Sequence, residues 1–399
     1  MSDQLTRRFG PFCLLKRIGM GGMAETWLAI RQITKGVRKF VVLKCILPAC
    51  NDDPGFIRLF YHEAAISLRL EHPNILHTWD CTVIEGRHVI VMEYLRGITL
   101  YELLQRIREK NMTLSPEIAA WIALQILSAF EYLHAYRDEN GECLNIVHRD
   151  VTPHNIFVSY DGQCRLFDFG VARAGSPEND LQKGMLVGKL SYMSPEQCQG
   201  KCVDARSDLF SLAAVLYEMA TNIAVFDREN DIRIIDALVS QPVQEPRQRF
   251  RDFPLFLSRI IMQGLEKSPE RRYQNAAEFA ADLRTFMKVG GYALTNHALR
   301  TLLADLYKEE IENLNQYLST MELTALKENE PPSMDQLIKE SHQVSDIAIG
   351  QVVDSVEIVE IASSKLSKLT QAANTIPEPD PAATHSDVFG RKKKWIFKS

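Results

Sequence analysis

The hydrophobic pattern of this chain changes about one hundred residues from its start. The first ninety or so residues alternate short β-rich runs with turns, whereas long helical patterns prevail from about Leu100 onward. We expect strands at Phe12 to Ile18, Thr26 to Ile30, Phe40 to Ile46 and His88 to Glu93, and helices at Asp53 to Leu70, Pro116 to Tyr136, Ser207 to Ala220, Leu255 to Leu265 and Ala276 to Met287. This order predicts an α+β fold of two lobes, a small β-rich N-terminal lobe and a larger helical C-terminal lobe, with a cleft between them.

Composition limits the classes to which the chain can belong. Hydrophobic residues make up 46% and charged residues 24% of the 399, which is the balance of a globular protein with a sizeable core. The net charge of −5 gives no whole-protein argument for nucleic-acid binding. No apolar run of about 18 residues predicts a transmembrane segment, and the opening MSDQLTRRFG has no signal-peptide core. The eight cysteines are scattered, and we interpret them as reduced thiols rather than as a zinc site. Together with the absence of a predicted transmembrane segment and signal peptide, they predict a cytoplasmic protein.

Residues 18–26 form a glycine-rich segment, IGMGGMAET, between two of the expected strands. Glycines there let backbone N–H groups approach phosphate oxygens, although Gly-rich hairpins are also common as structural turns. Strands on both sides argue against a Rossmann site, and the absence of a Gly-Lys-Ser/Thr motif argues against a Walker loop. A phosphate-binding loop and a structural turn remain as alternatives for this segment.

A lysine, Lys44, ends the hydrophobic run VVLK at residues 41–44 of an expected strand. A lone charge in that setting is costly unless it is paired. Glu63, nineteen residues further on in the expected helix, is the candidate partner. Such a pair would direct the ammonium group toward nucleotide phosphates, whereas the plainer interpretation is a strand lysine that reaches solvent.

The most informative block is HRDVTPHN at residues 148–155, which is followed by DFG at 168–170 and SPE at 194–196. Together with the glycine-rich segment and Lys44, these motifs resemble the signature segments of the eukaryotic-like (Hanks-type) protein kinases, in the style of the bacterial Ser/Thr kinases. The resemblance covers roughly residues 10–290. It implies an N-terminal lobe at about 10–92 and a C-terminal lobe at 93–290.

The resemblance implies phosphoryl transfer from ATP to Ser or Thr of protein substrates. In that chemistry the enzyme neutralises phosphate charge and orients the nucleophile. Asp150 would act as the base for the substrate hydroxyl, and Asn155 and Asp168 would supply oxygen ligands for Mg²⁺. Lys44, oriented by Glu63, would hold the nucleotide.

The resemblance also assigns residues to nucleotide binding and to structural support. The implied ATP-binding residues are Ile18, Gly19, Gly21, Gly22, Ala24, Thr26, Val42, Lys44, Met92, Glu93, Tyr94, Leu95 and Phe157. The implied structural residues are His148, Arg149, Glu196, Asp208 and Arg272, of which Glu196 and Arg272 would form a buried ion pair.

Thr152 departs from the family pattern, because Ser/Thr kinases carry a lysine two residues after the catalytic Asp. Lys189 stands where the family has a threonine that contacts both the Asp and that lysine. We therefore expect that the two side chains have exchanged places and that Lys189 supplies the missing catalytic cation. The alternatives are a solvated Lys189 with reduced activity, or a nucleotide-binding pseudokinase that acts as a scaffold.

Substrate type and regulation leave further alternatives. The catalytic loop lacks the Arg that tyrosine kinases of this fold carry after the Asp, which favours Ser/Thr substrates. The SPE segment and Arg272 favour proteins over small molecules as acceptors. Ser176 is the candidate activating phosphosite, and control by the C-terminal region or by a partner is an equal alternative.

The region after the two lobes divides into an expected helical extension at 291–328 and a tail at 329–399 that is partly helical and partly disordered. Residues 293–326 have a helical pattern, with leucines such as Leu314 and Leu318 available for docking. The run RKKKWIFK at 391–398 suits an anionic membrane surface or an acidic partner, whereas the plainer interpretation is a solvated end.

Overall fold

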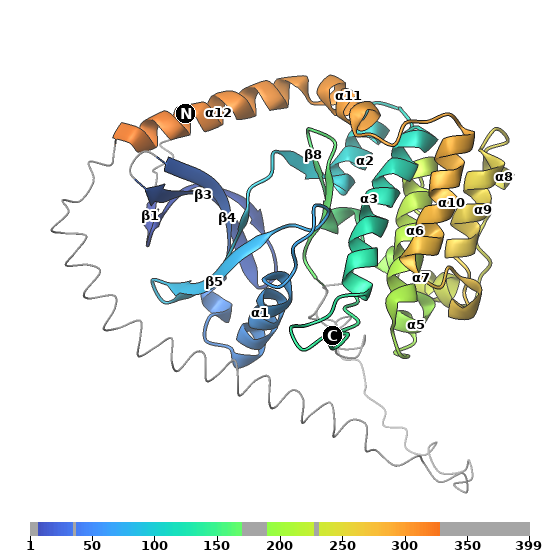
Figure 1. Cartoon of the computed structure of the whole chain (residues 1–399), viewed down its shortest axis with the longest axis horizontal. Helices are drawn as coiled ribbons and strands as arrows, with labels where there is room; N and C mark the ends of the chain where they lie inside the picture. The colour runs from blue at the N-terminus through green and yellow to red at the C-terminus, as the bar shows by residue number, and fades with distance from the viewer. Residues whose placement is uncertain (1–6, 35–36, 170–189, 227–230, 328–399) are drawn as a thin grey trace, which may run out of the picture. The chain divides into compact units, whose positions relative to one another are not determined.

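The computed structural model describes residues 7–34, 37–169, 190–226 and 231–327 (Figure 1). Gly170, Ser176 and Lys189, for which the sequence predicts roles, lie outside this described part, as does the tail at 329–399 with its basic run. Among the described residues, no helix combines the length and the apolar character that crossing a bilayer requires.

The N-terminal lobe is built on a six-stranded antiparallel sheet in the order β1-β2-β3-β4-β6-β5. The strands are β1 (Arg7–Phe9), β2 (Phe12–Met20), β3 (Ala24–Thr34), β4 (Val37–Ile46), β5 (Thr78–Ile84) and β6 (Arg87–Glu93). All four expected strands are therefore present, each inside a longer observed strand. Strands β1 and β5 had not been predicted.

Helix α1 (Pro54–Ser67) packs against this sheet (Figure 1). Asp53 caps its start, because the carboxylate accepts hydrogen bonds from the backbone of Gly55 and Phe56 at 2.7 and 3.3 Å. Phe60 and Ala64 of α1 lie in one apolar cluster with Val42 and Met92 of the sheet. The helix expected at 53–70 is confirmed, and this packing holds Glu63 close to the sheet.

The C-terminal lobe surrounds two helices, α3 (Pro116–His134) and α6 (Ala205–Thr221), whose residues are largely buried. The other helices are α2 (Leu100–Glu109), α5 (Pro195–Cys198), α7 (Asp231–Val239), α8 (Pro246–Arg249), α9 (Leu255–Gly264) and α10 (Ala276–Val289). A small sheet of β7 (Gly97–Thr99), β8 (Ile156–Ser159) and β9 (Cys164–Leu166) completes the lobe. The predicted α+β architecture, a small β-rich lobe and a larger helical lobe, is confirmed.

Two further helices, α11 (His297–Leu306) and α12 (Lys308–Lys327), follow the second lobe. The chain leaves α10 through Gly290 and Gly291, and Gly291 has a φ of 70°, a conformation that glycine adopts without strain. Leu299 and Leu303 of α11 are fully buried in the core of the C-terminal lobe. The extension is therefore packed against the lobe that precedes it.

Candidate active site

Lys44 is the centre of an ion-pair network that joins three elements. Its Nζ lies 2.6 Å from Glu63 Oε1 on α1 and 2.8 Å from Asp168 Oδ1, which follows β9. Burial lowers the pKa of Lys44, but the charges of Asp168 and Glu63 outweigh that effect and raise the pKa above its usual value. Lys44 therefore stays protonated across the physiological pH range. The sequence-based pairing of Lys44 with Glu63 is present, so this lysine is not directed to solvent.

Asp150 is 6% exposed and is oriented by Asn155, five residues later in the same loop. The side-chain amide nitrogen of Asn155 donates to Asp150 Oδ2 at 2.9 Å and to the Asp150 carbonyl at 2.8 Å. These bonds also decide which atom of Asn155 is available to a ligand, because its amide oxygen accepts no hydrogen bond from the described residues. The backbone N–H of Phe167 donates to the Asn155 carbonyl at 3.1 Å, which brings Asp168 next to this loop.

The backbone of the catalytic loop is fixed by Asp208 at the start of α6. Its carboxylate accepts hydrogen bonds from the N–H groups of His148 and Arg149 at 2.8 and 2.9 Å, and the side chain is 1% exposed. Arg149 and Asp168 have φ values of 65° and 55°, which non-glycine residues rarely adopt. Such backbone conformations persist where the surrounding contacts over-determine them, and they cluster at functional sites.

His148 is fully buried and links the catalytic loop to the segment before Asp168. Its Nε2 lies 3.2 Å from the Phe167 carbonyl, and its ring lies 4.9 Å from the ring of Phe169. Burial lowers the pKa of His148, although Asp208 and Asp150 oppose that effect. A neutral imidazole whose Nε2 carries the proton satisfies the carbonyl and leaves Nδ1 to accept from the Asp150 N–H at 3.3 Å, so the ring connects these two backbone segments.

The glycine-rich segment forms the turn between β2 and β3. Gly19 pairs with Thr26 across the hairpin, and the N–H of Gly21 donates to the Ala24 carbonyl at 2.8 Å. The methyl group of Ala24, 6% exposed, belongs to the apolar cluster that also contains Phe60. This side chain therefore packs in the lobe's core.

The predicted ATP-binding residues outside the glycine-rich turn come from one face of the sheet and from the segment after it, except for Phe157, which lies on β8 of the C-terminal lobe. Thr26 pairs with Lys44, and Val42 pairs with Met92, so these side chains lie on neighbouring strands. The carboxylate of Glu93 accepts a hydrogen bond from the His77 backbone at 2.8 Å. Glu93 thus uses its side chain for the protein itself, and its backbone N–H also donates to the His77 carbonyl at 3.0 Å.

Glu196 and Arg272 form the expected buried ion pair. The two guanidinium nitrogens of Arg272 lie 2.7 and 2.8 Å from the two carboxylate oxygens of Glu196, and the Ser207 hydroxyl also donates to that carboxylate. The Arg272 side chain is completely buried. Burial raises the pKa of Glu196, but hydrogen bonds from Arg272 and its charge outweigh that effect, so the pKa lies below its usual value. Two segments that are 76 residues apart in the sequence are therefore joined by this pair.

Two supporting residues escaped the sequence analysis. His134 Nε2 lies 3.0 Å from Asp208 Oδ2, and the Gln197 side-chain amide donates to the Arg149 carbonyl at 2.9 Å. Neither residue lies in a signature motif, and the relevant partners are 74 and 48 residues away along the chain. No local pattern could have identified them.

The described residues contain no group of three or more His, Cys, Asp or Glu side chains that could hold a metal ion by themselves. Asn155 and Asp168 nevertheless fit a magnesium ion bound together with phosphates, because Mg²⁺ takes one or two protein oxygens plus phosphate oxygens and water. The Asp168 side chain is 45% exposed, and the oxygen of Asn155 is the hard ligand type that Mg²⁺ prefers.

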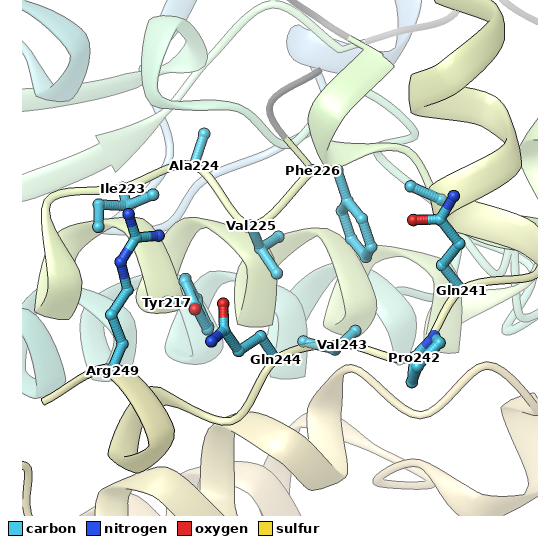
Figure 2. A pocket seen from close by; sticks show the side chains of 11 residues that line it. Tyr217, Ile223, Ala224, Val225, Phe226, Gln241, Pro242, Val243, Gln244 and Arg249 are labelled. Carbon is cyan, nitrogen blue, oxygen red and sulfur yellow. The ribbon is translucent and has the colours of Figure 1, made fainter. Parts of the chain in front are cut away.

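A separate hollow of about 270 Å³ lies between the end of α6 and the segment that leads into α8 (Figure 2). Apolar side chains such as Val225 and Phe226 line it together with the polar Gln241, Gln244 and Arg249. None of the predicted active-site residues lines it.

Comparison with known proteins identifies the family. The model of the protein kinase domain matches residues 12–282. The tyrosine-protein kinase MasK of Myxococcus xanthus is 35% identical over 283 residues, which is 71% of this chain and 44% of that protein. The serine/threonine-protein kinase PrkC of Bacillus subtilis is 33% identical over 276 residues, 69% of this chain and 40% of that protein. The matched region spans less than half the length of these relatives.

Solved structures give the same result for the fold. The kinase domain of PknI from Mycobacterium tuberculosis superposes with a TM-score of 0.52 at 24% identity, and the match covers 71% of this chain and 99% of that domain. The geometry of the site, the family model and these relatives agree. The chain belongs to the protein kinase family.

Proposed function

We propose that this chain transfers the γ-phosphoryl group of ATP to Ser or Thr side chains of protein substrates. The observation that carries the proposal is the joining of Lys44, Glu63 and Asp168 beside the Asp150–Asn155 pair. Residues 10–290 would carry the activity, with lobes at 10–92 and 93–290. Residues 291–328 would be a helical extension.

In the reaction, the substrate hydroxyl oxygen forms a bond to the γ-phosphorus while the bond from that phosphorus to the ADP oxygen breaks. The hydroxyl proton passes to the Asp150 carboxylate. Asn155 holds this carboxylate in place, because its side-chain amide donates a hydrogen bond to Asp150 Oδ2. Lys44 contributes a fixed positive charge that binds the nucleotide phosphates. Asp168 and Asn155 would hold Mg²⁺, which supplies neutralisation of the phosphate charge.

The catalytic loop also supports the exchange between Thr152 and Lys189. Thr152 is 2% exposed, and its hydroxyl takes no hydrogen bond from the described residues. A buried hydroxyl without a partner is costly, so a group from outside the described part is expected to satisfy it. We propose that Lys189 approaches Asp150 and Thr152 and supplies the missing cation.

The exchange has a direct test in phosphoryl transfer. Lys189→Ala should lower the rate, and the double variant Thr152→Lys with Lys189→Thr should restore it in part. Full activity of Lys189→Ala would show that this lysine is only a solvated loop residue. The single variant Thr152→Lys is the control. It shows whether a lysine at position 152 raises the transfer rate by itself, without the change at position 189.

Ser/Thr acceptors are favoured by residues 151–154, VTPH, which contain no arginine. PrkC and the PknB proteins of mycobacteria are named serine/threonine kinases. The name of MasK, a tyrosine-protein kinase, makes tyrosine the second candidate acceptor. Phosphoamino-acid analysis of a protein substrate labelled by this chain separates the two, because phosphotyrosine as the main product would exclude the Ser/Thr proposal.

The test of the whole proposal is incubation of the full chain with Mg-ATP and a generic protein substrate, beside Asp150→Asn and Asp168→Asn. Transfer by the wild type that both variants lose supports the kinase. Nucleotide binding by the wild type without transfer would instead support a pseudokinase scaffold.

A further inference from the structure

Helix α12 carries an apolar stripe that packs on the N-terminal lobe. Leu314, Tyr317, Leu318 and Met321 recur at helical spacing and lie in one cluster with Leu15, Leu28, Ile30 and Phe40 of the sheet. Leu318 is only 2% exposed. A helix that follows the C-terminal lobe in sequence is thereby buried against the other lobe (Figure 1).

The sheet face under α12 is the face that forms the nucleotide site. Side chains two residues apart in a strand point to the same side. Phe40 therefore shares its side of β4 with Val42 and Lys44, and Leu28 shares its side of β3 with Thr26. The apolar surface that α12 covers is therefore continuous with the predicted ATP-binding residues Thr26 and Val42.

The segment that connects the two lobes also touches α12. Tyr94 belongs to the same cluster and packs 6.0 Å from the ring of Phe40. Arg96 donates to the side-chain oxygen of Asn315 at 3.1 Å. The connection between the lobes is thus held from the α12 side.

The start of α12 and the residue before it are anchored to the C-terminal lobe. Arg106 of α2 lies 2.6 Å from Glu310, and its guanidinium lies 4.6 Å from the centre of the Tyr307 ring. The Tyr307 hydroxyl donates to the Glu102 carbonyl at 3.2 Å, and Tyr307 is 4% exposed. The start of α12 is therefore fixed to the C-terminal lobe, and the later part of the helix is fixed to the N-terminal lobe.

We propose that α11 and α12 form an interlobe brace that fixes the position of the two lobes and thereby strengthens nucleotide binding. A helix fixed at both ends resists rotation about the connecting segment, because opening the lobes must break one anchor. ATP binding that requires the observed lobe position is then coupled to brace docking, and such coupling acts in both directions. This inference rests on the proposed function for its nucleotide readout. A simpler alternative is that α12 only stabilises the sheet on which it packs.

Two variants of the full chain release the brace at opposite ends. Leu318→Asp places a charge in the apolar cluster on the N-terminal lobe. At the other end, the paired change Tyr307→Ala with Glu310→Ala, counted here as one release variant, removes the ring under Arg106, the hydroxyl bond to Glu102 and the ion pair with Arg106. Ser319→Asp is the matched control, since it adds the same charge at the neighbouring exposed position of the same helix. Thermal unfolding first establishes that each variant is folded, and Met321→Ala replaces Leu318→Asp if that variant does not fold.

The affinity for a fluorescent ATP analogue with Mg²⁺ distinguishes a brace from local stabilisation. Each release should weaken binding by about 5- to 150-fold, the usual range of coupling between sites. The variant that combines both releases should be no weaker than the weaker release variant, because a brace with one broken end is already released. Unchanged affinity in both folded release variants, or effects that multiply in the combined variant, would overturn the proposal.

Amide hydrogen exchange of residues 94–96, measured without nucleotide, tests the brace independently of the proposed kinase function. If the wild type does not bind the analogue, the proposed function fails while the brace is still tested. Both release variants should then exchange faster than the wild type at these residues, and Ser319→Asp should not. Equal exchange in all four proteins would refute the brace by itself.

Discussion

Replacing Arg272 should lower the stability of the folded protein by an amount that can be estimated from the contacts of its side chain. The Arg272→Met variant keeps much of the side-chain volume but leaves the Glu196 carboxylate, among the described residues, with only the Ser207 hydroxyl as a side-chain donor. The arginine also donates to the carbonyls of Glu266 and Lys267 at 2.7 and 2.9 Å. The substitution therefore leaves several buried acceptors without their donors.

The size of the effect follows from this burial. Breaking a buried ion pair by removing one partner costs about 3–5 kcal/mol. For a domain of this size class, about 2–4 °C of melting temperature correspond to each kcal/mol, so the expected loss is about 6–20 °C. By contrast, the pair of Arg284 with Glu131 is 3.7 Å long and partly exposed, and such pairs contribute about 0–1 kcal/mol.

The assay is thermal unfolding followed by circular dichroism, with Arg284→Met as the matched control. Arg272→Met should melt far below the wild type, and Arg284→Met should melt within a few degrees of it. Equal melting temperatures for the two arginine variants would refute the argument that burial decides the contribution of these pairs.

The remaining predictions concern pH and the catalytic loop. Because the pKa of Glu196 is lowered in the folded protein, its contribution to stability is present above the usual carboxyl pKa of 4.5 and is lost as the pH falls through the lowered value. Acid unfolding of Glu196→Gln should therefore depend less steeply on pH below about 4.5 than that of the wild type. Asp208→Ala removes the acceptor for two backbone N–H groups of the loop. It should lower kcat more than it raises KM for ATP, and an unchanged kcat would contradict the role assigned to Asp208. Glu63→Gln should weaken ATP binding, measured with a fluorescent ATP analogue, because Lys44 loses one of its two carboxylate partners.

The chemistry of the site was accessible from the sequence because it resides in short contiguous motifs. Asp150 and Asn155 are five residues apart, and their hydrogen bonds close within one loop. Lys44 could be paired with Glu63 because a charge in a hydrophobic strand requires a partner. The resemblance supplied the remaining roles, including the Glu196–Arg272 pair.

Contacts between distant segments were less accessible. The leucines of α12 predicted a buried face, but hydrophobic spacing does not identify the surface on which such a face packs. Strand β5, with the sequence TWDCTVI, was missed because its mixture of polar and apolar residues gives no clear alternation. His134 supports Asp208 through tertiary structure alone.

The central claim is that Asp150 acts on the substrate hydroxyl and not on the nucleotide. The decisive measurement is the transfer rate of Asp150→Asn at saturating Mg-ATP, together with its affinity for nucleotide. The account predicts a rate about 10²- to 10⁴-fold below the wild type, as for loss of a general base, with nucleotide affinity unchanged. A wild-type rate in the folded variant, or a loss of nucleotide binding that explains the lower rate, would contradict it.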